Sequence, residues 1–341
     1  MKNKAHDTLV AILSGGISDE DYLSRRSVEV VEPALRACGY QVEVLDWASD
    51  GTVRILGSEP ERSWPSVVSC FVEYRPDVVF NALHGDRENA GQLQGFFELA
   101  GIPMTGHGIA ASVIGMDKIL SKDVFDELNI PHPRSARLGF PGHDDDSVAL
   151  GAVVAATIGY PLMLKLTHGG SSSGLELVNK EEELREVWHR WADRGGEHVG
   201  MAYAEEFVDG PEYCIGIFGH WRIPEVHVLP TARIEFDSRY FDKSVKHDNK
   251  YRVICDDTVP EELEEGMQLA ALAMHRHLRF TGFSRIDFRV RGDRFYALEV
   301  NTHPGLSPSS IIINTLACSD LTIEQAVEDL VSWAIDPPTV D

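Results

Sequence analysis

The chain has 341 residues, of which 43% are hydrophobic and 25% are charged, a composition typical of an ordinary globular protein of two or three domains. Its 54 acidic residues outnumber its 31 basic ones and give a formal net charge of −23 at pH 7, which argues against a nucleic-acid or anionic-membrane surface. The five cysteines are scattered, with no C-x-x-C pair, so we expect reduced cysteines in a cytoplasmic protein.

The first unit, residues 1–108, alternates predicted strands and helices. TLVAIL, YQVEVLDW and PDVVFNALHG predict strands, and a helix is expected between an N-cap at Ser18 and Gly39. This alternation predicts a parallel sheet with helices on its faces and ligands beyond the carboxyl ends of its strands, where His84 lies. Glu20 falls in the first turn of the helix, where stabilisation by the helix dipole is enough to explain a carboxylate.

The second unit, residues 109–207, contains a candidate phosphate loop. A helix is predicted at about 117–128, and TGHGIAA (105–111) is interpreted as a loop leading into a helix rather than as a dinucleotide fingerprint. The predicted strands PLMLKL and LELV are joined by THGGSSSG (167–174), whose N–H groups and hydroxyls suit a phosphate, while Lys165 adds a positive charge. The loop lacks the Walker A pattern, and a flexible hairpin explains it equally well.

The third unit, residues 208–341, contains a hairpin with three oxygen-bearing side chains. Glu299 and Asn301 lie two residues apart in the second strand and therefore share a face. Asp287 in the first strand can face Glu299 directly only if the loop has an odd number of residues, for example the three residues 292–294. Two carboxylates and an amide, without His or Cys, suit Mg²⁺. A surface hairpin with ordinary carboxylates is an equally good interpretation.

Eight short motifs follow one another between residues 15 and 310. They read GGISDE, HGDRENAGQLQG, MDK, KxxxGGSSSG, EEFVDGPEY, YFDKSVKH, GFSRIDFRV and LEVNTHPG. In this order they resemble the D-alanine–D-alanine ligase family of the ATP-grasp superfamily over nearly the whole chain. The resemblance implies an α/β structure in which an ATP-grasp fold follows an N-terminal Rossmann-like parallel-sheet domain. The implied domains are residues 1–108, a central subdomain at 109–207 with the phosphate loop, and a C-terminal subdomain at 208–341 with the metal site.

The resemblance also implies that ATP lies between the second and third units. Phosphate binding would fall to Lys118, Lys165, Ser171 and Lys246, of which Lys246 would reach the transferring phosphoryl group. The adenine hinge would consist of Glu205, Glu206, Phe207 and Val208, and Glu212 would bind the ribose hydroxyls. Two metal ions, Mg²⁺ or Mn²⁺, would be held by Asp287, Glu299 and Asn301.

Two amino-acid subsites are implied as well. Glu20, supported by Ser171, would hold the ammonium group of the first amino acid, and Arg285 with the N–H of Gly305 would stabilise a tetrahedral oxyanion. Ser310 would bind the carboxylate of the second substrate, at the start of a helix with Ser307 as its N-cap. The other implied substrate-binding residues are His84 and Ile311.

The implied reaction is ATP-dependent joining of a carboxylate and an amine. Transfer of the γ-phosphoryl group would convert the first amino acid to an acyl phosphate, which the amine of the second would attack. D-Alanine or a close analogue is the expected substrate, and a homodimer is expected from the family. We expect the partners to be ATP and small amino acids, and we expect no nucleic-acid or membrane partner.

Four positions depart from the family pattern, and all lie near the amino-acid subsites. Residues 88–90 read Glu-Asn-Ala where the family has Gly-Glu-Asp, Asp21 replaces a common His, and Gly169 replaces a frequent Glu. His247 replaces a Tyr, as it also does in D-alanine–D-lactate ligases. A protonated imidazole would repel an incoming ammonium group, so we hypothesise that the nucleophile changes with pH, although His247 could equally serve only as a hydrogen-bond donor.

These departures leave three alternatives open. The chain could be a D-alanine–D-lactate or other D-alanine–D-X ligase, or an ATP-grasp dipeptide ligase of specialised metabolism. A non-catalytic ATP-binding protein is the third alternative. It is disfavoured because the lysines, the arginine and the metal-ligand candidates are all present.

Overall fold

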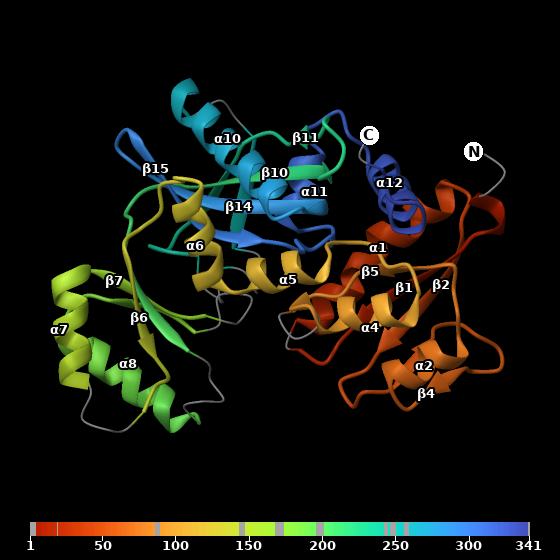
Figure 1. The fold of residues 1–341 in the computed structure, drawn as a ribbon, viewed down its shortest axis with the longest axis horizontal. Coiled ribbons are helices and arrows are strands. Elements are labelled where there is room, and N and C mark those ends of the chain that lie inside the picture. Colours follow the sequence, from red (N-terminus) through yellow and green to blue (C-terminus); the bar gives the residue numbers. More distant parts are fainter. Residues whose placement is uncertain are drawn as a thin grey trace.

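The computed structural model describes residues 5–18, 20–85, 89–142, 147–167, 174–195, 201–241, 245, 250–255 and 259–339. These residues form three sheets. The N-terminal sheet lies at one end of the molecule, and the four-stranded sheet with its two covering helices lies at the other (Figure 1). The predicted α/β class is confirmed. Within these ranges, no helix has the length and hydrophobicity that crossing a membrane requires.

The first sheet has the predicted parallel core. β1 pairs in parallel with β2 on one side and with β5 on the other, and β3 and β4 add an antiparallel edge that was not predicted. The strands are β1 (Leu9–Gly15), β2 (Gln41–Trp47), β3 (Val53–Ile55), β4 (Ser63–Trp64) and β5 (Val78–Asn81). The helical segments are η1 (Ala5–Asp7), α1 (Asp21–Ala37), α2 (Val67–Glu73) and α4 (Gln92–Ala100). The carboxyl ends of β1 and β5 therefore meet at one edge of the sheet.

The start of α1 differs from the prediction. Glu20, not Ser18, is the N-cap residue, and its side chain makes no capping hydrogen bond. The Ser18 hydroxyl donates instead to the carbonyl oxygen of His84 at 3.0 Å and so joins the loops that follow β1 and β5. A tertiary partner has replaced the local capping bond. The end of α1 agrees with the prediction, since Gly39 follows it with a φ of +92°.

The second sheet is antiparallel, in the order β6-β9-β7-β8. Its strands are β6 (Ser135–Gly139), β7 (Leu162–Leu166), β8 (Leu175–Val178) and β9 (Ala202–Glu206). Two helices, α7 (Ser147–Thr157) and α8 (Glu181–Asp193), cover one face. Leu162, Leu164, Ala202 and Ala204 point into that apolar layer. Because strand residues alternate between faces, the residues between them point to the opposite face, away from the helices.

Two consecutive helices connect the first sheet to the rest of the chain. They are α5 (Ile109–Met116) and α6 (Lys118–Glu127). The carboxylate of Asp117 caps α6 by accepting from the N–H groups of Ile119 and Leu120 at 2.8 and 3.0 Å. The predictions of a loop entering a helix after 105–111 and of a helix at about 117–128 are confirmed.

The third sheet is antiparallel, in the order β13-β12-β10-β14-β15, with β11 paired to β10. Its strands are β10 (Glu212–His220), β11 (His227–Val228), β12 (Ala232–Phe236), β13 (Tyr251–Ile254), β14 (Thr281–Arg291) and β15 (Arg294–Asn301). Helix α10 (Glu261–His277) covers one face, where Ile215, Ile286 and Phe288 pack with Met267 and Met274. Pro260 is the N-cap residue of this helix.

Asp287 and Glu299 face each other across the hairpin of β14 and β15, as predicted, but the length of the turn is not what aligns them. Asp287 lies opposite Glu299, but Arg291 pairs with Arg294, so the turn has two residues rather than the predicted three. A β-bulge between the two strands shifts the register and restores the alignment. Leu298 is the extra residue, because Ala297 faces Phe288 and Glu299 faces Asp287.

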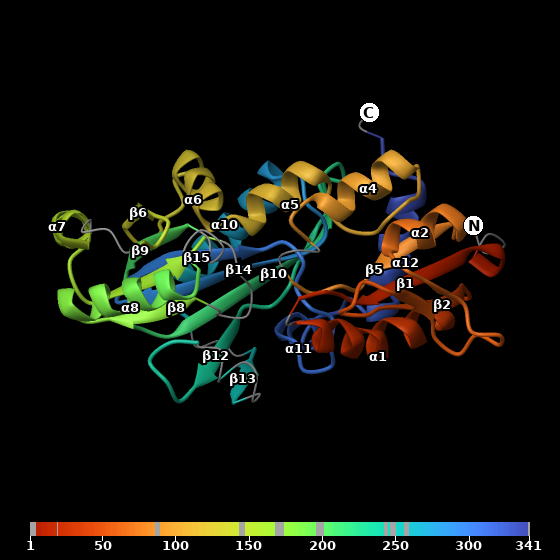
Figure 2. The same ribbon diagram turned by 90° about the horizontal axis from the view of Figure 1, so that it is seen from below.

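The end of the chain returns to the first sheet. Helix α11 (Ile311–Leu316) leads to α12 (Ile323–Ile335), which lies against α1 (Figure 2). Residues of α12 share one apolar cluster with β1, β5 and Phe283 of β14. Leu330 packs directly over Gly282, since a Cβ there would lie 2.6 Å from its Cδ2. The N-terminal unit is thus fixed to the third sheet by a common core.

Replacing Leu330 by Ala should weaken this junction. The side chain is 6% exposed, and a cavity of this kind costs about 2–5 kcal/mol. We expect the free energy of unfolding, measured by urea titration, to fall by that amount. The matched control is Leu269→Ala on α10, where the side chain is 59% exposed and the change should stay below about 1 kcal/mol. Equal losses for the two variants would contradict the packing of α12.

Candidate active site

A cavity of about 230 Å³ lies where the three sheets meet. It is bordered by the loops after β1 and β5, by the inner faces of the second and third sheets, and by the segment that leads into α11. Of the predicted site residues, Ser171, Lys246 and His247 lie outside the described ranges. All the others line this one cavity: Glu20, His84, Lys118, Lys165, Glu205, Glu206, Phe207, Val208, Glu212, Arg285, Asp287, Glu299, Asn301, Gly305, Ser310 and Ile311.

Strand alternation explains why the charged side chains of the third sheet face the cavity. Arg285, Asp287 and Arg289 alternate with Ile286 and Phe288, which pack under α10. The register places Asn301 opposite Arg285 and Glu299 opposite Asp287, so all these polar groups share one face. Residues that face each other across antiparallel strands lie on the same side of the sheet. The polar and apolar faces of the sheet are therefore set by one alternating pattern.

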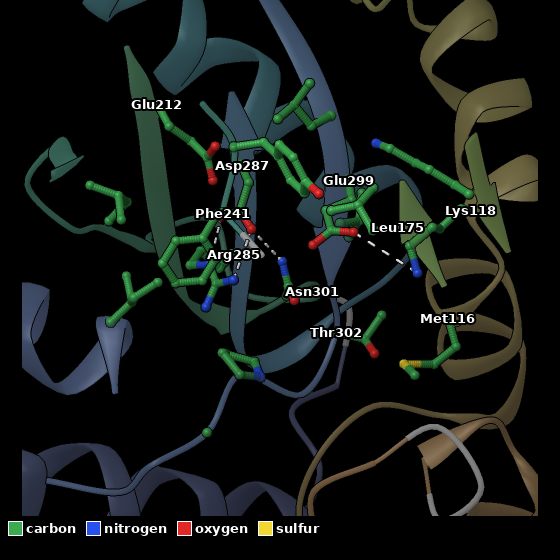
Figure 3. Close-up of a pocket in the computed structure, with 18 of the residues that line it drawn as sticks. Met116, Lys118, Leu175, Glu212, Phe241, Arg285, Asp287, Glu299, Asn301 and Thr302 are labelled. Carbon is green, nitrogen blue, oxygen red and sulfur yellow. Dashed lines mark hydrogen bonds and ion pairs between the residues drawn. The ribbon is translucent and has the colours of Figure 1, made fainter. Parts of the chain in front are cut away.

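Asp287 is the centre of a buried hydrogen-bonded group. Arg285 donates to both of its carboxylate oxygens, from Nε to Oδ1 at 2.6 Å and from Nη2 to Oδ2 at 2.8 Å. Nδ2 of Asn301 donates to Oδ2 at 2.9 Å (Figure 3). Burial lowers the pKa of Arg285, but the carboxylate of Asp287 more than compensates and raises that pKa well above its ordinary value. Arg285 and Asp287 therefore form a bidentate ion pair.

The hairpin offers oxygen donors that fit a hard cation. Asp287, Glu299 and Asn301 lie together at the cavity, and Nζ of Lys118 is 4.0 Å from Oε2 of Glu299 (Figure 3). In the part of the chain that the structure describes, no three His, Cys, Asp or Glu side chains form a possible metal cluster. A metal ion at the hairpin would therefore have two carboxylates, one amide oxygen, and oxygens of water or substrate, which is a donor set typical of Mg²⁺.

A second charged group lies on the inner face of the second sheet. Nζ of Lys165 on β7 donates to Oε1 of Glu205 on β9 at 2.9 Å, and Nζ of Lys122 on α6 lies 2.6 Å from Oε2. Burial raises the pKa of Glu205, but the two ammonium groups lower it by more, so the net shift is downward. Glu205 is therefore ionised and is held between two lysines.

Glu212 has a different environment. Its Oε2 accepts from Nε and Nη2 of Arg289 at 3.3 Å each. Burial raises the pKa of this carboxyl group to about 7, because the attraction of Arg289 offsets the burial only in part and Asp287 and Glu299 add negative charge. The carboxyl group of Glu212 therefore titrates near neutral pH.

Arg289 also fixes the segment between β9 and β10. Its Nη1 donates to the carbonyl oxygen of Val208 at 2.9 Å, and its guanidinium lies 5.3 Å from the centre of the Phe207 ring. Glu206 accepts from Arg134 and Arg291 at 2.9 Å each. The predicted hinge residues therefore belong to a segment that is hydrogen-bonded to both neighbouring sheets.

The loop before α11 approaches the N-terminal unit very closely. A Cβ on Gly305 would lie 1.8 Å from Nε2 of His84, so only glycine fits against this ring. Glu20 is 9% exposed and lines the same part of the cavity. Ser310 is itself the N-cap of α11 and accepts from the N–H of Ile313 at 3.4 Å. The prediction of Ser307 as N-cap is wrong, because the segment between Ser307 and Ser310 is not helical.

Comparison with known proteins agrees with this geometry. The family model described as "D-ala D-ala ligase C-terminus" matches residues 124–332. The chain is 33% identical over 334 residues to a D-alanine–D-alanine ligase of Pseudomonas entomophila, covering 95% of each protein. The chain belongs to the D-alanine–D-alanine ligase family.

Solved structures support the same fold, the ATP-grasp fold of the D-alanine–D-alanine ligase family. The structure of the VanG D-Ala:D-Ser ligase from Enterococcus faecalis aligns with a TM-score of 0.78 and 25% identity, covering 95% of this chain and 98% of that one. A D-alanine–D-alanine ligase from Bacillus anthracis, complexed with ATP, aligns with a TM-score of 0.73 and 21% identity over 96% and 97% of the two chains.

Two charged residues of this ligase-family site were not predicted from the sequence: Arg289, which lines the cavity, and Lys122, which lies behind its wall. Lys122 lies four residues after Lys118 on α6, and Arg289 lies two residues after Asp287 on β14. In a helix, residues four apart lie on the same face, and in a strand residues two apart do. Lys122 and Arg289 therefore share a face with the predicted site residues Lys118 and Asp287. Extending each motif by one period would have found them. The burial that makes them ion-pair partners is a property of the tertiary structure.

Replacing Glu212 by Gln should change how stability depends on pH. The carboxyl pKa is about 7 in the folded protein against an ordinary 4.5, so the stabilising contribution of its proton is complete below pH 4.5 and is lost as the pH rises through 7. We expect the free energy of unfolding of the wild type to fall relative to Glu212→Gln between pH 5 and pH 8. Urea titrations without divalent metal measure this, and a constant difference would contradict the raised pKa.

Proposed function

We propose that the chain is an ATP-dependent carboxylate–amine ligase of the D-alanine–D-alanine ligase type. One observation carries the proposal: predicted site residues from all three sheets line one cavity. The curated relatives that align over nearly their whole length are D-alanine–D-alanine ligases, which supports D-alanine as the substrate. The functional units would be residues 1–108, 109–207 and 208–341, acting in a cytoplasmic homodimer.

ATP would lie between the second and third sheets. Lys118 on α6 and Lys165 on β7 both line the cavity. They would bind the phosphates, together with Ser171 and Lys246 outside the described ranges. Residues 205–208 border the same space and would enclose the adenine, while Glu212 would accept hydrogen bonds from the ribose hydroxyls. This arrangement uses the positive groups for the phosphates and the ionisable carboxyl group for the sugar.

Asp287, Glu299 and Asn301 would hold Mg²⁺, with Mn²⁺ as a substitute. When bound, the metal supplies positive charge that offsets the negative charge of the phosphates. Asp287, Glu299 and Asn301 line the cavity together, and their carboxylate and amide oxygens are donors that this cation prefers. Two ions are proposed, as the family resemblance implies.

The reaction would have two steps. The carboxylate of the first D-alanine, held at its ammonium group by Glu20, attacks the γ-phosphorus of ATP, and ADP leaves as the acyl phosphate forms. The amine of the second substrate then attacks the acyl carbon, loses a proton, and phosphate leaves as the C–O bond breaks. Arg285 commits one Nε–H and one Nη2–H to Asp287, so three of its five N–H donors remain for the oxyanion.

The second substrate would enter beside Ser310 and Ile311. His84 and Gly305 lie at the boundary between the N-terminal loops and the segment that leads into α11, where the acyl carbon would be placed. The N–H of Gly305 would be the second donor to the oxyanion. Close packing of Gly305 on His84 supports a rigid position for that N–H.

A D-alanine–D-X ligase is the second candidate function. Asn89 stands where the family pattern has an acidic residue, and it is buried, donating to the carbonyl oxygens of Leu83 and Gly85 at 3.2 and 3.1 Å. The loop that carries His84 is thus held by a neutral amide. The likeness to a D-Ala:D-Ser ligase at 25% identity also supports a changed second substrate.

Replacing Glu299 by Gln should abolish turnover. The amide cannot supply the negative charge that the metal site needs, so we expect D-alanine-dependent ADP release to fall at least about 100-fold while the fold is retained. The matched control is Asp293→Asn in the exposed turn of the same hairpin, which should keep wild-type activity. Wild-type activity in Glu299→Gln would remove Glu299 from the metal site.

The choice of nucleophile should depend on pH if His247 controls it. Below about pH 7 a protonated imidazole would favour D-lactate as the second substrate, and above it D-alanine. Phosphate release with each nucleophile, measured from pH 5.5 to pH 9 with D-alanine as the first substrate, tests this. A preference that stays constant over the range would contradict the hypothesis, and His247→Tyr should make the preference for D-alanine constant.

A further inference from the structure

Three charged side chains form a buried row beside the cavity. Lys122, Glu205 and Lys165 are 4%, 1% and 8% exposed. The two lysines lie on different carboxylate oxygens of Glu205, Lys122 at 2.6 Å from Oε2 and Lys165 at 2.9 Å from Oε1. Each of the three comes from a different element, namely α6, β7 and β9.

Only two of the three reach the cavity. Lys165 and Glu205 line it, whereas Lys122 is not among its lining residues. The β7–β9 register puts Met163 opposite Glu205 and Lys165 opposite Tyr203, so all four face away from α7 and α8. Lys122 reaches the same carboxylate from α6, which packs against β15 of the third sheet (Figure 1). The row therefore runs from the wall of the cavity to the interior.

The charge of the row depends on Lys122. Lys165 and Glu205 alone are neutral as a pair, and a neutral pair attracts an anion weakly. With Lys122 included, the row carries a net charge of +1. Burial and the neighbouring ammonium group of Lys165 lower the pKa of Lys122, and the carboxylate of Glu205 offsets them only in part, so the net shift is downward. The contact at 2.6 Å with Glu205, whose own pKa is lowered, is what favours the charged form of Lys122 in the interior.

We propose that Lys122 is a positioning residue for nucleotide binding. Its ammonium group pairs with Oε2 of Glu205 on the side away from the cavity. This pairing offsets the negative charge of Glu205, so that Lys165 presents a net positive charge to the phosphates of ATP. The proposal rests on the proposed function, because it requires a nucleotide in the cavity. Lys122 itself does not contact the nucleotide in this arrangement.

The test compares ligands with and without phosphates. We would measure the dissociation constants of Mg-ADP and of adenosine for the full chain by competition with a fluorescent nucleotide. In Lys122→Met, the affinity for Mg-ADP should fall about tenfold while the affinity for adenosine stays within about twofold. A general loss of structure would weaken both ligands alike, so equal losses would overturn the proposal.

A double variant decides whether the effect is one of charge. Lys122→Met/Glu205→Gln removes one positive and one negative charge and leaves Lys165 with its net +1. The ratio of the adenosine and Mg-ADP dissociation constants should return to within about threefold of the wild-type ratio. A ratio that stays at the Lys122→Met value would overturn the proposal. If Lys122→Met does not fold, the double variant and Lys122→Arg still test the proposal. Lys122→Arg keeps the positive charge and should therefore keep the wild-type ratio of the two dissociation constants.

A matched control lies next to Lys122 on the same helix. Asp123→Asn breaks the ion pair of Asp123 with Arg137 on the solvent side of α6 and should change neither dissociation constant. Failure of the proposed function is distinguishable from failure of this proposal. If the wild type binds no nucleotide, the proposed function is contradicted. If the wild type binds Mg-ADP and Lys122→Met has the wild-type ratio of adenosine to Mg-ADP dissociation constants, only the role of Lys122 is contradicted.

Discussion

The buried carboxylates of the cavity depend on partners of opposite charge, and this pairing shapes the site. An unpaired ionised group is too costly to bury, so three carboxylates on the inner faces of the second and third sheets lie beside guanidinium or ammonium groups. Asp287 is held by Arg285, Glu212 by Arg289, and Glu205 by two lysines. The charged side chains on the inner faces of the second and third sheets thus have partners of opposite charge. These ion pairs hold the charges in position before any ligand binds.

Fixed charges are useful to a ligase that handles ATP, because preorganised groups need no rearrangement when negative charge develops. The same pairing also connects parts of the site. Arg289 joins Glu212 to the carbonyl oxygen of Val208, so the segment between β9 and β10 is tied to β14. The end of the second sheet is therefore hydrogen-bonded to the third sheet at the proposed nucleotide site.

The N-terminal unit completes the cavity through close packing. Helix α12 shares a core with β1 and β5, which fixes the loops that carry Glu20 and His84 against the third sheet. Gly305 lies so near the His84 ring that no side chain fits between them. Residues almost three hundred positions apart, such as Glu20 and Ser310, consequently line the same cavity.

The sequence by itself determined the local pattern. Alternating residues along SRIDFRV and FYALEVN predicted a shared polar face, the β-α alternation of the first unit predicted a parallel sheet, and the ordered motifs indicated the family. These features depend on neighbours two to four positions apart, so they can be read from a single chain. The oxygen donors of the hairpin and Lys165 beside the phosphate loop were predicted this way, whereas the other site residues were assigned by the family resemblance; those in the described ranges meet at one cavity.

Only the tertiary structure decided the partners and the register. The bulge at Leu298, rather than the length of the turn, aligns Asp287 with Glu299, because a sheet can absorb an extra residue where packing favours it. Ser18 binds the carbonyl of His84 instead of capping α1, and Lys122 becomes a buried partner of Glu205. For Ser18 and Lys122 the partner lies far away in the sequence, where local spacing carries no information about it.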